Sequence, residues 1–196
     1  MSSINLSKGQ KISLSKDGGA LTKVKMGLGW DPVASAPKKG LFKRATPEKQ
    51  IDLDASVVLL DANRQVVDTV WFRQLRSKDG SVTHTGDNLT GAGDGDDESI
   101  LVDLSAVPSN VEVLAFTVNS FSSQGFGDVA NAFCRIVDET TGAEFARYDL
   151  SAQGSHSALV MAKVYRHGGE WKMAALGDSG SGKTVAEILP LVQQVV

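Results

Sequence analysis

The stretch Ile51-Asp52-Leu53-Asp54-Ala55-Ser56-Val57-Val58-Leu59-Leu60-Asp61 alternates apolar and acidic residues at its start and then becomes an apolar run. Because successive side chains of a β-strand point to opposite faces, the alternation predicts a strand with Asp52 and Asp54 on one face. Similar runs recur between turn residues, at Val24–Trp30, Val66–Arg73, Ser99–Leu104, Val111–Asn119, Ala132–Asp138, Glu144–Leu150, Ala158–Tyr165 and Glu170–Leu176. Many short strands at this spacing favour an all-β fold, an antiparallel β-sandwich, over alternating strands and helices.

The remainder of the 196-residue chain is expected to complete one domain, residues 1–196, around this sandwich. The opening repeats itself, as Ile4-Asn5-Leu6-Ser7-Lys8 and Ile12-Ser13-Leu14-Ser15-Lys16, and predicts two short edge strands. Residues 31–50 are rich in proline and lysine, and we expect them to form a mobile basic loop. Residues 177–184 are expected to form a flexible Gly/Ser turn that precedes a short C-terminal helix.

Composition argues against several classes of protein. No apolar run approaches the roughly 20 residues that span a bilayer, and Met1–Gln10 lacks the apolar core of a secretory signal. We therefore expect a cytoplasmic protein that neither inserts directly into a membrane nor binds nucleic acid. Cys134 is the single cysteine, and its apolar neighbours predict a buried side chain rather than a nucleophile. His84, His156 and His167 are scattered beside turns, without the spacing of a zinc site, so we expect no enzyme; for His84 we expect a surface or loop position.

Charge is distributed unevenly along the chain, although the net charge is only −3. From Asp79 to Cys134 the sequence has nine acidic residues and no lysine or arginine. The densest part, Gly86 to Glu98, contains five carboxylates, one asparagine and four glycines. Hard oxygen donors on a flexible loop suit Ca²⁺, which takes six to eight oxygen ligands in loose geometry. A bound cation would relieve the repulsion and couple metal binding to folding.

The sequence thus predicts a Ca²⁺ centre, with two adjacent ions sharing this acidic loop. Its candidate ligands are Asp87, Asn88, Asp94, Asp96, Asp97 and Glu98 of the loop, Asp52 and Asp54 of the strand beside it, and, as a weaker candidate, Asp31. The spacing does not match an EF-hand, because Leu89 and Gly91 occupy ligand positions of that motif. The simpler alternative is a solvated acidic turn that only aids solubility.

Several motifs resemble the TerD family of tellurium-resistance proteins. They include Gly27-Leu28-Gly29-Trp30-Asp31, Ile51-Asp52-Leu53-Asp54-Ala55-Ser56, His84-Thr85-Gly86-Asp87-Asn88-Leu89-Thr90-Gly91, Gly95-Asp96-Asp97-Glu98 and Ala146-Arg147-Tyr148-Asp149-Leu150. Asp68-Thr69-Val70-Trp71-Phe72-Arg73 and Gln153-Gly154-Ser155-His156 are most similar to its TerZ branch. The resemblance implies a bacterial, cytoplasmic, Ca²⁺-binding β-sandwich of the tellurite and general stress response, with the ligands among the acids named above. It also implies other Ter proteins as partners, one of them embedded in the membrane.

A competing motif is Gly177-Asp178-Ser179-Gly180-Ser181-Gly182-Lys183-Thr184, which fits the phosphate-binding P-loop pattern letter for letter. The alternative function is therefore nucleotide binding. Only twelve residues follow Thr184, however, and Pro190 is expected to break the helix that a P-loop requires. A third possibility is a membrane-docking adaptor that uses the basic loop 31–50.

Overall fold

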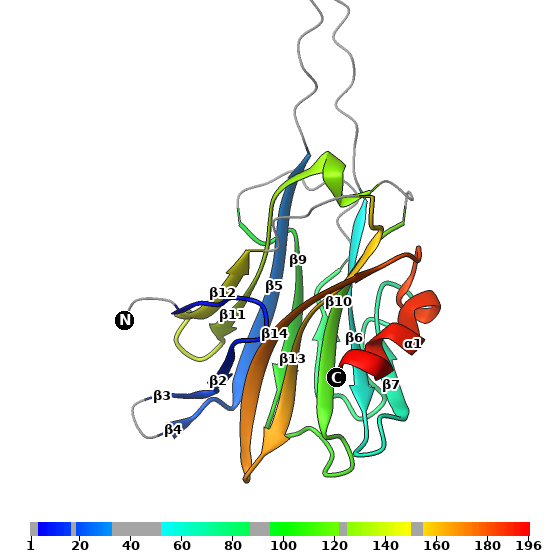
Figure 1. The fold of residues 1–196 in the computed structure, drawn as a ribbon. Coiled ribbons are helices and arrows are strands. Elements are labelled where there is room, and N and C mark those ends of the chain that lie inside the picture. The colour runs from blue at the N-terminus through cyan, green and yellow to red at the C-terminus, as the bar shows by residue number, and fades with distance from the viewer. Residues whose placement is uncertain (1–3, 17–18, 33–51, 87–94, 122–124, 150–154) are drawn as a thin grey trace, which may run out of the picture.

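The computed structural model describes residues 4–16, 19–32, 52–86, 95–121, 125–149 and 155–196. The predicted ligands Asp87, Asn88 and Asp94, and the basic loop beyond residue 32, lie outside these ranges. The described part of the chain contains two six-stranded sheets, one two-stranded ribbon, a short 3₁₀ helix and one α-helix (Figure 1). The predicted β-sandwich with a short C-terminal helix is confirmed.

The first sheet has the strand order β1-β12-β11-β5-β9-β8. Its strands are β1 (Ile4–Asn5), β12 (Glu144–Asp149), β11 (Val129–Asp138), β5 (Lys23–Pro32), β9 (Glu98–Asp103) and β8 (Val82–His84). Neighbouring strands are antiparallel except for β1 and β12, which pair in parallel. The helix η1 (Phe126–Asp128) leads into β11.

The second sheet is antiparallel, with the order β2-β14-β13-β10-β6-β7. Its strands are β2 (Lys11–Ser13), β14 (Glu170–Gly180), β13 (Ala158–His167), β10 (Val113–Ser120), β6 (Leu53–Leu60) and β7 (Val66–Val70), and β3 (Ser15–Lys16) and β4 (Gly19–Ala20) form the separate ribbon. The repeated opening supplies β1 and β2, one edge strand to each sheet, as predicted. The longer predicted strands are confirmed too, whereas the three-residue β8 was not predicted.

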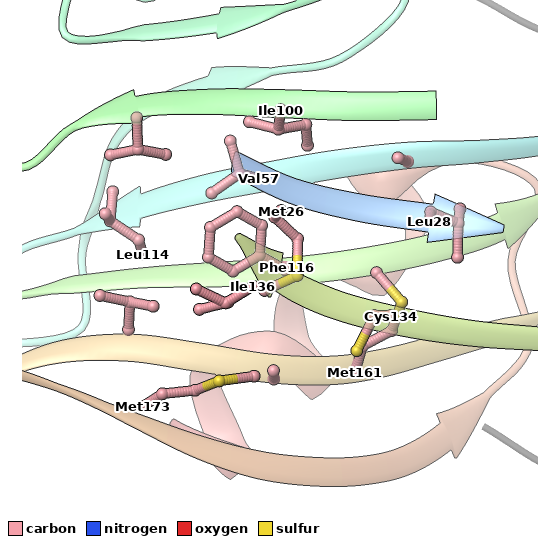
Figure 2. Close-up of a cluster of buried hydrophobic side chains, with 14 of the residues drawn as sticks. Met26, Leu28, Val57, Ile100, Leu114, Phe116, Cys134, Ile136, Met161 and Met173 are labelled. Carbon is pink, nitrogen blue, oxygen red and sulfur yellow. The ribbon is translucent and has the colours of Figure 1, made fainter. Parts of the chain in front are cut away.

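The core fills the space between the two sheets. Met26 of β5 and Ile136 of β11 meet Phe116 of β10 and Met161 of β13, and all four are buried (Figure 2). Cys134 lies among them with no exposed surface, and burial raises the pKa of its thiol to about 12. The prediction of a buried cysteine is confirmed, and the raised pKa agrees with a side chain that is not a nucleophile. Burying each large apolar side chain contributes roughly 1.5–3 kcal/mol to folding.

The helix α1 (Val185–Val195) covers the outer face of the second sheet (Figure 1). Ile188 and Val192 of the helix pack on Val58 and Val160 of the sheet. The helix continues through Pro190, so the prediction that this proline would break it is wrong. The physical reason is that the buried face of the helix holds both halves against the sheet and outweighs the lost backbone hydrogen bond.

Strand β14 extends to Gly180, so the prediction of a flexible turn over residues 177–184 is wrong for its first four residues. Asp178, Ser179 and Gly180 pair in register with β13. Strand β5 likewise extends through Pro32, two residues into the predicted basic loop. In the described ranges, no helix is both long enough and apolar enough to cross a membrane.

Candidate metal centre

Residues 95–98, the described end of the acidic loop and called the acidic segment below, cross β5 at two glycines. Asp97 donates its backbone N–H to the Leu28 carbonyl over 2.8 Å, and β9 pairs with β5 from the next residue onward. A Cβ on Gly27 would overlap the Asp96 carboxylate, and a Cβ on Gly29 would lie 2.5 Å from the Gly95 carbonyl oxygen. Glycine at both positions of β5 therefore leaves the space in which the acidic segment lies.

Asp31 and Asp97 face one small cavity of about 170 Å³. Its lining is Trp30, Asp31, Gly95, Asp97, Asn131, Phe133 and Arg147. Asp97 is fixed by the Trp30 backbone N–H, which donates to Oδ2 over 2.9 Å. Burial of the Asp97 carboxylate, together with the charges of Asp31 and Asp96, raises its pKa above the ordinary value despite that hydrogen bond. Placing negative charge here is therefore unfavourable unless a cation compensates it.

A β-bulge shapes the rim of this cavity. Between Ala130 and Phe133 the pairing of β11 with β5 shifts, and Asn131 adopts a left-handed backbone conformation with φ of 51°. The Asn131 side chain donates from Nδ2 to Asp31 Oδ2 over 2.8 Å. Bulges and left-handed non-glycine residues are enriched beside functional sites. The sequence offered no signal for Asn131, because the bulge depends on strand register.

Asp96 is held by protein cations instead. Its carboxylate lies 2.9 Å from Lys25 Nζ and 2.6 Å from Arg135 Nε. Burial raises the Asp96 pKa, but the bonds and charges of Arg135 and Lys25 outweigh burial, so the net pKa is lowered. From Asp79 to Cys134 the sequence contains no lysine or arginine, and the structure brings the compensating charges from the neighbouring strands β5 and β11. Asp96 thus has protein partners that anchor the acidic segment to the sheet.

Glu98 is buried and connects the two sheets. Strand β7 pairs with β6 from Val57 to Leu60 and does not reach Ala55 near the start of β6. There the Ala55 backbone N–H donates to Glu98 Oε2 of the first sheet over 2.6 Å. His84 Nε2 lies 3.2 Å from the Ala55 carbonyl oxygen and 3.4 Å from Glu98 Oε2, while its Nδ1 accepts the Gly86 N–H over 3.1 Å. These contacts place the proton of a neutral His84 on Nε2. The expectation of a surface or loop histidine is wrong, since His84 is 3% exposed and belongs to β8.

Two other predicted ligands, Asp52 and Asp54 at the start of β6, do not line this cavity. On β6, Val58 packs under α1, and the two-residue period places Asp54 on the same outer face of the second sheet. Its cross-strand neighbour there is Asn119 of β10. Asp96 and Asp97 instead lie on the first sheet. Of the predicted ligands in the described ranges, Asp31 and Asp97 share a cavity, and no three His, Cys, Asp or Glu side chains there converge as a metal group.

Three groups beside the cavity carry oxygens of the kind that Ca²⁺ binds. Asp31 and Asp97 offer hard carboxylate oxygens, and the close approach over Gly29 brings the Gly95 carbonyl beside them. Burial and the charges of Asp31 and Asp96 raise the pKa of Asp97, and a bound cation would oppose both effects. Ca²⁺ needs more oxygens than these. The predicted ligands Asp87, Asn88 and Asp94 belong to the same acidic loop of the sequence and lie outside the described residues. Their part in the centre stays a prediction.

The P-loop pattern does not form a phosphate-binding loop. Its first four residues belong to β14: Gly177 has a left-handed backbone (φ 68°) at a shift in the pairing with β13, and the next three residues pair with that strand. A Cβ on Gly177 would overlap the Tyr148 hydroxyl. The Lys183 backbone N–H donates to Glu187 Oε2 over 3.1 Å, so the amide is occupied by the helix's own glutamate. A P-loop needs those amides to curl around phosphate, and the structure contradicts that arrangement.

Comparison with known proteins agrees with this fold. A TerD domain model matches residues 1–190. The chain is 52% identical over 186 residues to the tellurium resistance protein TerZ of Serratia marcescens, covering 94% of both chains. It is 44% identical to general stress protein 16U of Bacillus subtilis, covering 91% of this chain and 92% of that one. A solved homologue of the telluride resistance protein TerD from Streptomyces coelicolor superimposes with a TM-score of 0.68 at 19% identity, over 87% and 96% of the two chains. The chain therefore belongs to the TerD family of tellurium-resistance and general stress proteins.

Proposed function

We propose that this protein binds Ca²⁺ at the acidic end of its first sheet and acts in the tellurite and general stress response as a sensor or scaffold, without catalysing a reaction. The observation that carries the proposal is the cavity that Asp31 and Asp97 share. Both carboxylates face it, and burial together with the charges of Asp31 and Asp96 raises the pKa of Asp97, so a negative charge there is unfavourable. Metal binding there would remove an unfavourable charge from the folded state.

The anchoring of the acidic segment supports this role. Asp96 is tied to Lys25 and Arg135, and Glu98 is tied to Ala55 and His84, on either side of Asp97. Asp97 is therefore fixed in position before a ligand arrives, which lowers the entropy lost on binding. The Glu98 contacts also connect the candidate centre to β6 of the second sheet. Ca²⁺ binding could be transmitted along that connection to partner proteins.

The biological setting is proposed from the relatives. Their names assign them to tellurium resistance and to general stress. We propose a cytoplasmic protein that works with other Ter proteins, including a membrane-embedded one, and that takes up two Ca²⁺ ions. The second ion would involve the candidate ligands that lie outside the Asp31–Asp97 cavity.

Thermal unfolding tests the proposal. We expect the midpoint to rise with Ca²⁺ above its value in chelator, and to respond much less to Mg²⁺, which requires a tighter octahedral site. At a free Ca²⁺ concentration of 100 times Kd, linkage predicts about 2.7 kcal/mol of stabilisation per site. Asp97→Asn and Asp31→Asn should reduce this shift, whereas Glu170→Gln, an exposed acid at the far end of β14, should keep it. Identical midpoints in Ca²⁺, Mg²⁺ and chelator would reject Ca²⁺ binding.

Two further measurements test the number of ions and the role. Native mass spectrometry of the Ca²⁺-loaded protein should show two bound ions. In cells, deletion of this protein should lower survival in tellurite, and wild type should restore it better than Asp97→Asn. Equal rescue by both would separate the stress role from the metal centre.

A further inference from the structure

Three lysines gather on the outer face of the second sheet. Lys11 lies on β2, Lys172 on β14 and Lys163 on β13, which are neighbouring strands (Figure 1). The residue that follows each lysine packs in or against the core, so the two-residue period of a strand turns the lysines outward. Cross-strand pairing brings them together, because Ala174 is the partner of Lys11 on one side and of Lys163 on the other. Two ammonium groups therefore flank a residue that is too small to separate them.

The positive charge of these lysines is not balanced among them. In the part of the chain that the structure describes, none of the three ammonium groups forms an ion pair or a hydrogen bond. Burial, together with the charges of Lys11 and Arg64, lowers the pKa of Lys163 below its ordinary value. The neighbouring acid on this face, Glu170, instead accepts a hydrogen bond from Ser13 Oγ over 3.0 Å. Three lysines and one glutamate leave a surplus of positive charge, which a bound anion would relieve.

A cavity of about 320 Å³ lies among these groups. Its lining is Lys11, Ile12, Ser13, Tyr165, His167 and Lys172. The rings of Tyr165 and His167 meet edge to face with their centres 6.4 Å apart, and neither side chain has a hydrogen-bond partner in the described ranges. Lys163 Nζ lies 5.3 Å from the centre of the Tyr165 ring, beside the cavity. The cavity therefore offers two ammonium groups, a phenol and an imidazole as donors, with a third ammonium group next to them.

We propose that this cavity binds the diphosphate group of a small soluble ligand, held by Lys11, Lys163 and Lys172. The inference is independent of the proposed Ca²⁺ binding. Lysine ammonium groups are compact charges on flexible stems and can reach phosphate oxygens from several directions, whereas a single carboxylate suits the planar fork of arginine. Lysines from three strands need several negative charges within one small volume, and a diphosphate carries them on two adjacent groups.

The main alternative is the anionic surface of a membrane. A site of that kind places large apolar side chains beside its lysines, so that they enter the boundary of the acyl chains. Among the residues that the structure describes, the exposed large apolar side chains are Ile4, Val66, Leu75 and Phe121, and none of them lies on β2, β13 or β14. A soluble phosphate ligand therefore fits this face better. The remaining alternative is a solvated basic patch, which would bind every anion equally weakly.

The test is calorimetric titration of the full chain with inorganic diphosphate, orthophosphate and citrate at matched ionic strength. The buffer is freed of divalent metals on a chelating resin, because a soluble chelator is itself a polyanion. Diphosphate should bind at one site, at least about tenfold more tightly than orthophosphate or citrate. Lys172→Gln and Lys163→Met should each weaken diphosphate binding at least about tenfold, the usual loss of a hydrogen bond to a charged group. Lys183→Gln removes an exposed positive charge three residues beyond the opposite end of β14 and should keep the wild-type Kd.

Several outcomes would overturn the site. They are no diphosphate binding, equal Kd values for the three anions, an unchanged Kd in Lys172→Gln, and equal weakening in Lys183→Gln, which would show a dependence on net charge alone. Should Lys163→Met fail to fold, Lys11→Gln on the edge strand β2 replaces it with the same expectation. Co-sedimentation with phosphatidylcholine vesicles that contain phosphatidic acid tests the other source of phosphate. Vesicle binding that is lost in Lys172→Gln, without binding of free diphosphate, would assign the face to a membrane and refute a soluble ligand.

Discussion

Replacing Gly29 by alanine should displace the acidic segment and weaken the metal centre. A Cβ at this position would lie 2.5 Å from the Gly95 carbonyl oxygen and would also overlap the edge of the Phe133 ring. Gly95 cannot yield as the end of a side chain can, because the atom in contact belongs to the backbone. The strand must therefore separate from the acidic segment, which moves Asp97 relative to Asp31 and strains the bond from the Trp30 N–H to Asp97.

The expected size of the effect follows from two opposing contributions. Overpacking of this kind costs roughly 1–3 kcal/mol, while removing a glycine from the unfolded chain returns about 0.4–1 kcal/mol. The difference between the two ranges is about 0–2.6 kcal/mol, and because the contact is with backbone we expect Gly29→Ala in its upper half, a loss of about 1.3–2.6 kcal/mol without metal, or roughly 3–10 °C for a protein of this size. Its Ca²⁺-dependent shift should fall by more than half, as measured by calorimetry or circular dichroism in Ca²⁺ and in chelator.

Gly180→Ala is the matched control. Gly180 also lies in a strand, but its Cβ would meet Leu191 Cδ2 at 2.7 Å, the far end of a flexible side chain. That variant should stay within about 1 kcal/mol of wild type and keep the full Ca²⁺ shift. If Gly29→Ala matched it in both respects, the close crossing over β5 would not position the metal ligands, and the reasoning would be wrong.

Three other changes should give measurable results. Asp97→Asn should make the metal-free protein more stable at pH 7, because it removes a buried charge beside Asp31 and Asp96, and should lose the Ca²⁺ shift; a metal-free midpoint below wild type would contradict this. Asp68→Asn should destabilise by about 1–3 kcal/mol at pH 7. Burial raises the Asp68 pKa, but hydrogen bonds from Lys78, Gln74 and Thr69 outweigh it, so the folded pKa is below normal. The stabilisation by Asp68 is therefore complete above the unfolded pKa near 3.9 and decreases as pH falls towards the folded pKa. If the difference in unfolding free energy between wild type and Asp68→Asn stayed constant down to about pH 3, this explanation would be wrong. Pro190→Ala should raise the free energy of unfolding by up to about 3 kcal/mol, because it restores a backbone N–H inside α1. An unchanged denaturant midpoint would contradict this stabilisation.

The sequence was sufficient for most of the fold because its strand signals are local. Alternating residues and glycine or asparagine turns specify β5, β6, β9 and β10 within about two residues. Strand β8 was missed because three residues are too few for a visible period. The prediction that Pro190 would break the helix failed for a different reason. The effect of a proline on an isolated helix can be judged from the local sequence, whereas the packing of Ile188 and Val192 on the sheet cannot.

The candidate centre could be predicted only in part. The density of acids located the segment, and Asp31 and Asp97 share a cavity. Which acids have protein partners depends on register across strands, as with Arg135 and Lys25 beside Asp96, and single-sequence patterns contain no such information. The same limit left the places of Asn131 and Arg147 beside the cavity unpredicted, although Arg147 belongs to a motif that resembles the family. The two-residue period predicted one face for Asp52 and Asp54, but it could not predict that Asp54 lies on the outer face of the second sheet.

The N-terminal segment has a consequence for how this protein resists self-association. Strand β1 protects the free backbone of β12, and β2 protects that of β14, so fewer than fifteen residues seal one open side of both sheets. Deleting residues 1–16 would expose two ladders of unsatisfied amides and carbonyls, and one of them belongs to the strand of Arg147. Exposed ladders recruit strands from other molecules. A shortened chain would therefore polymerise edge to edge, and a partner strand that took the place of β1 would lie directly against the strand that bears Arg147.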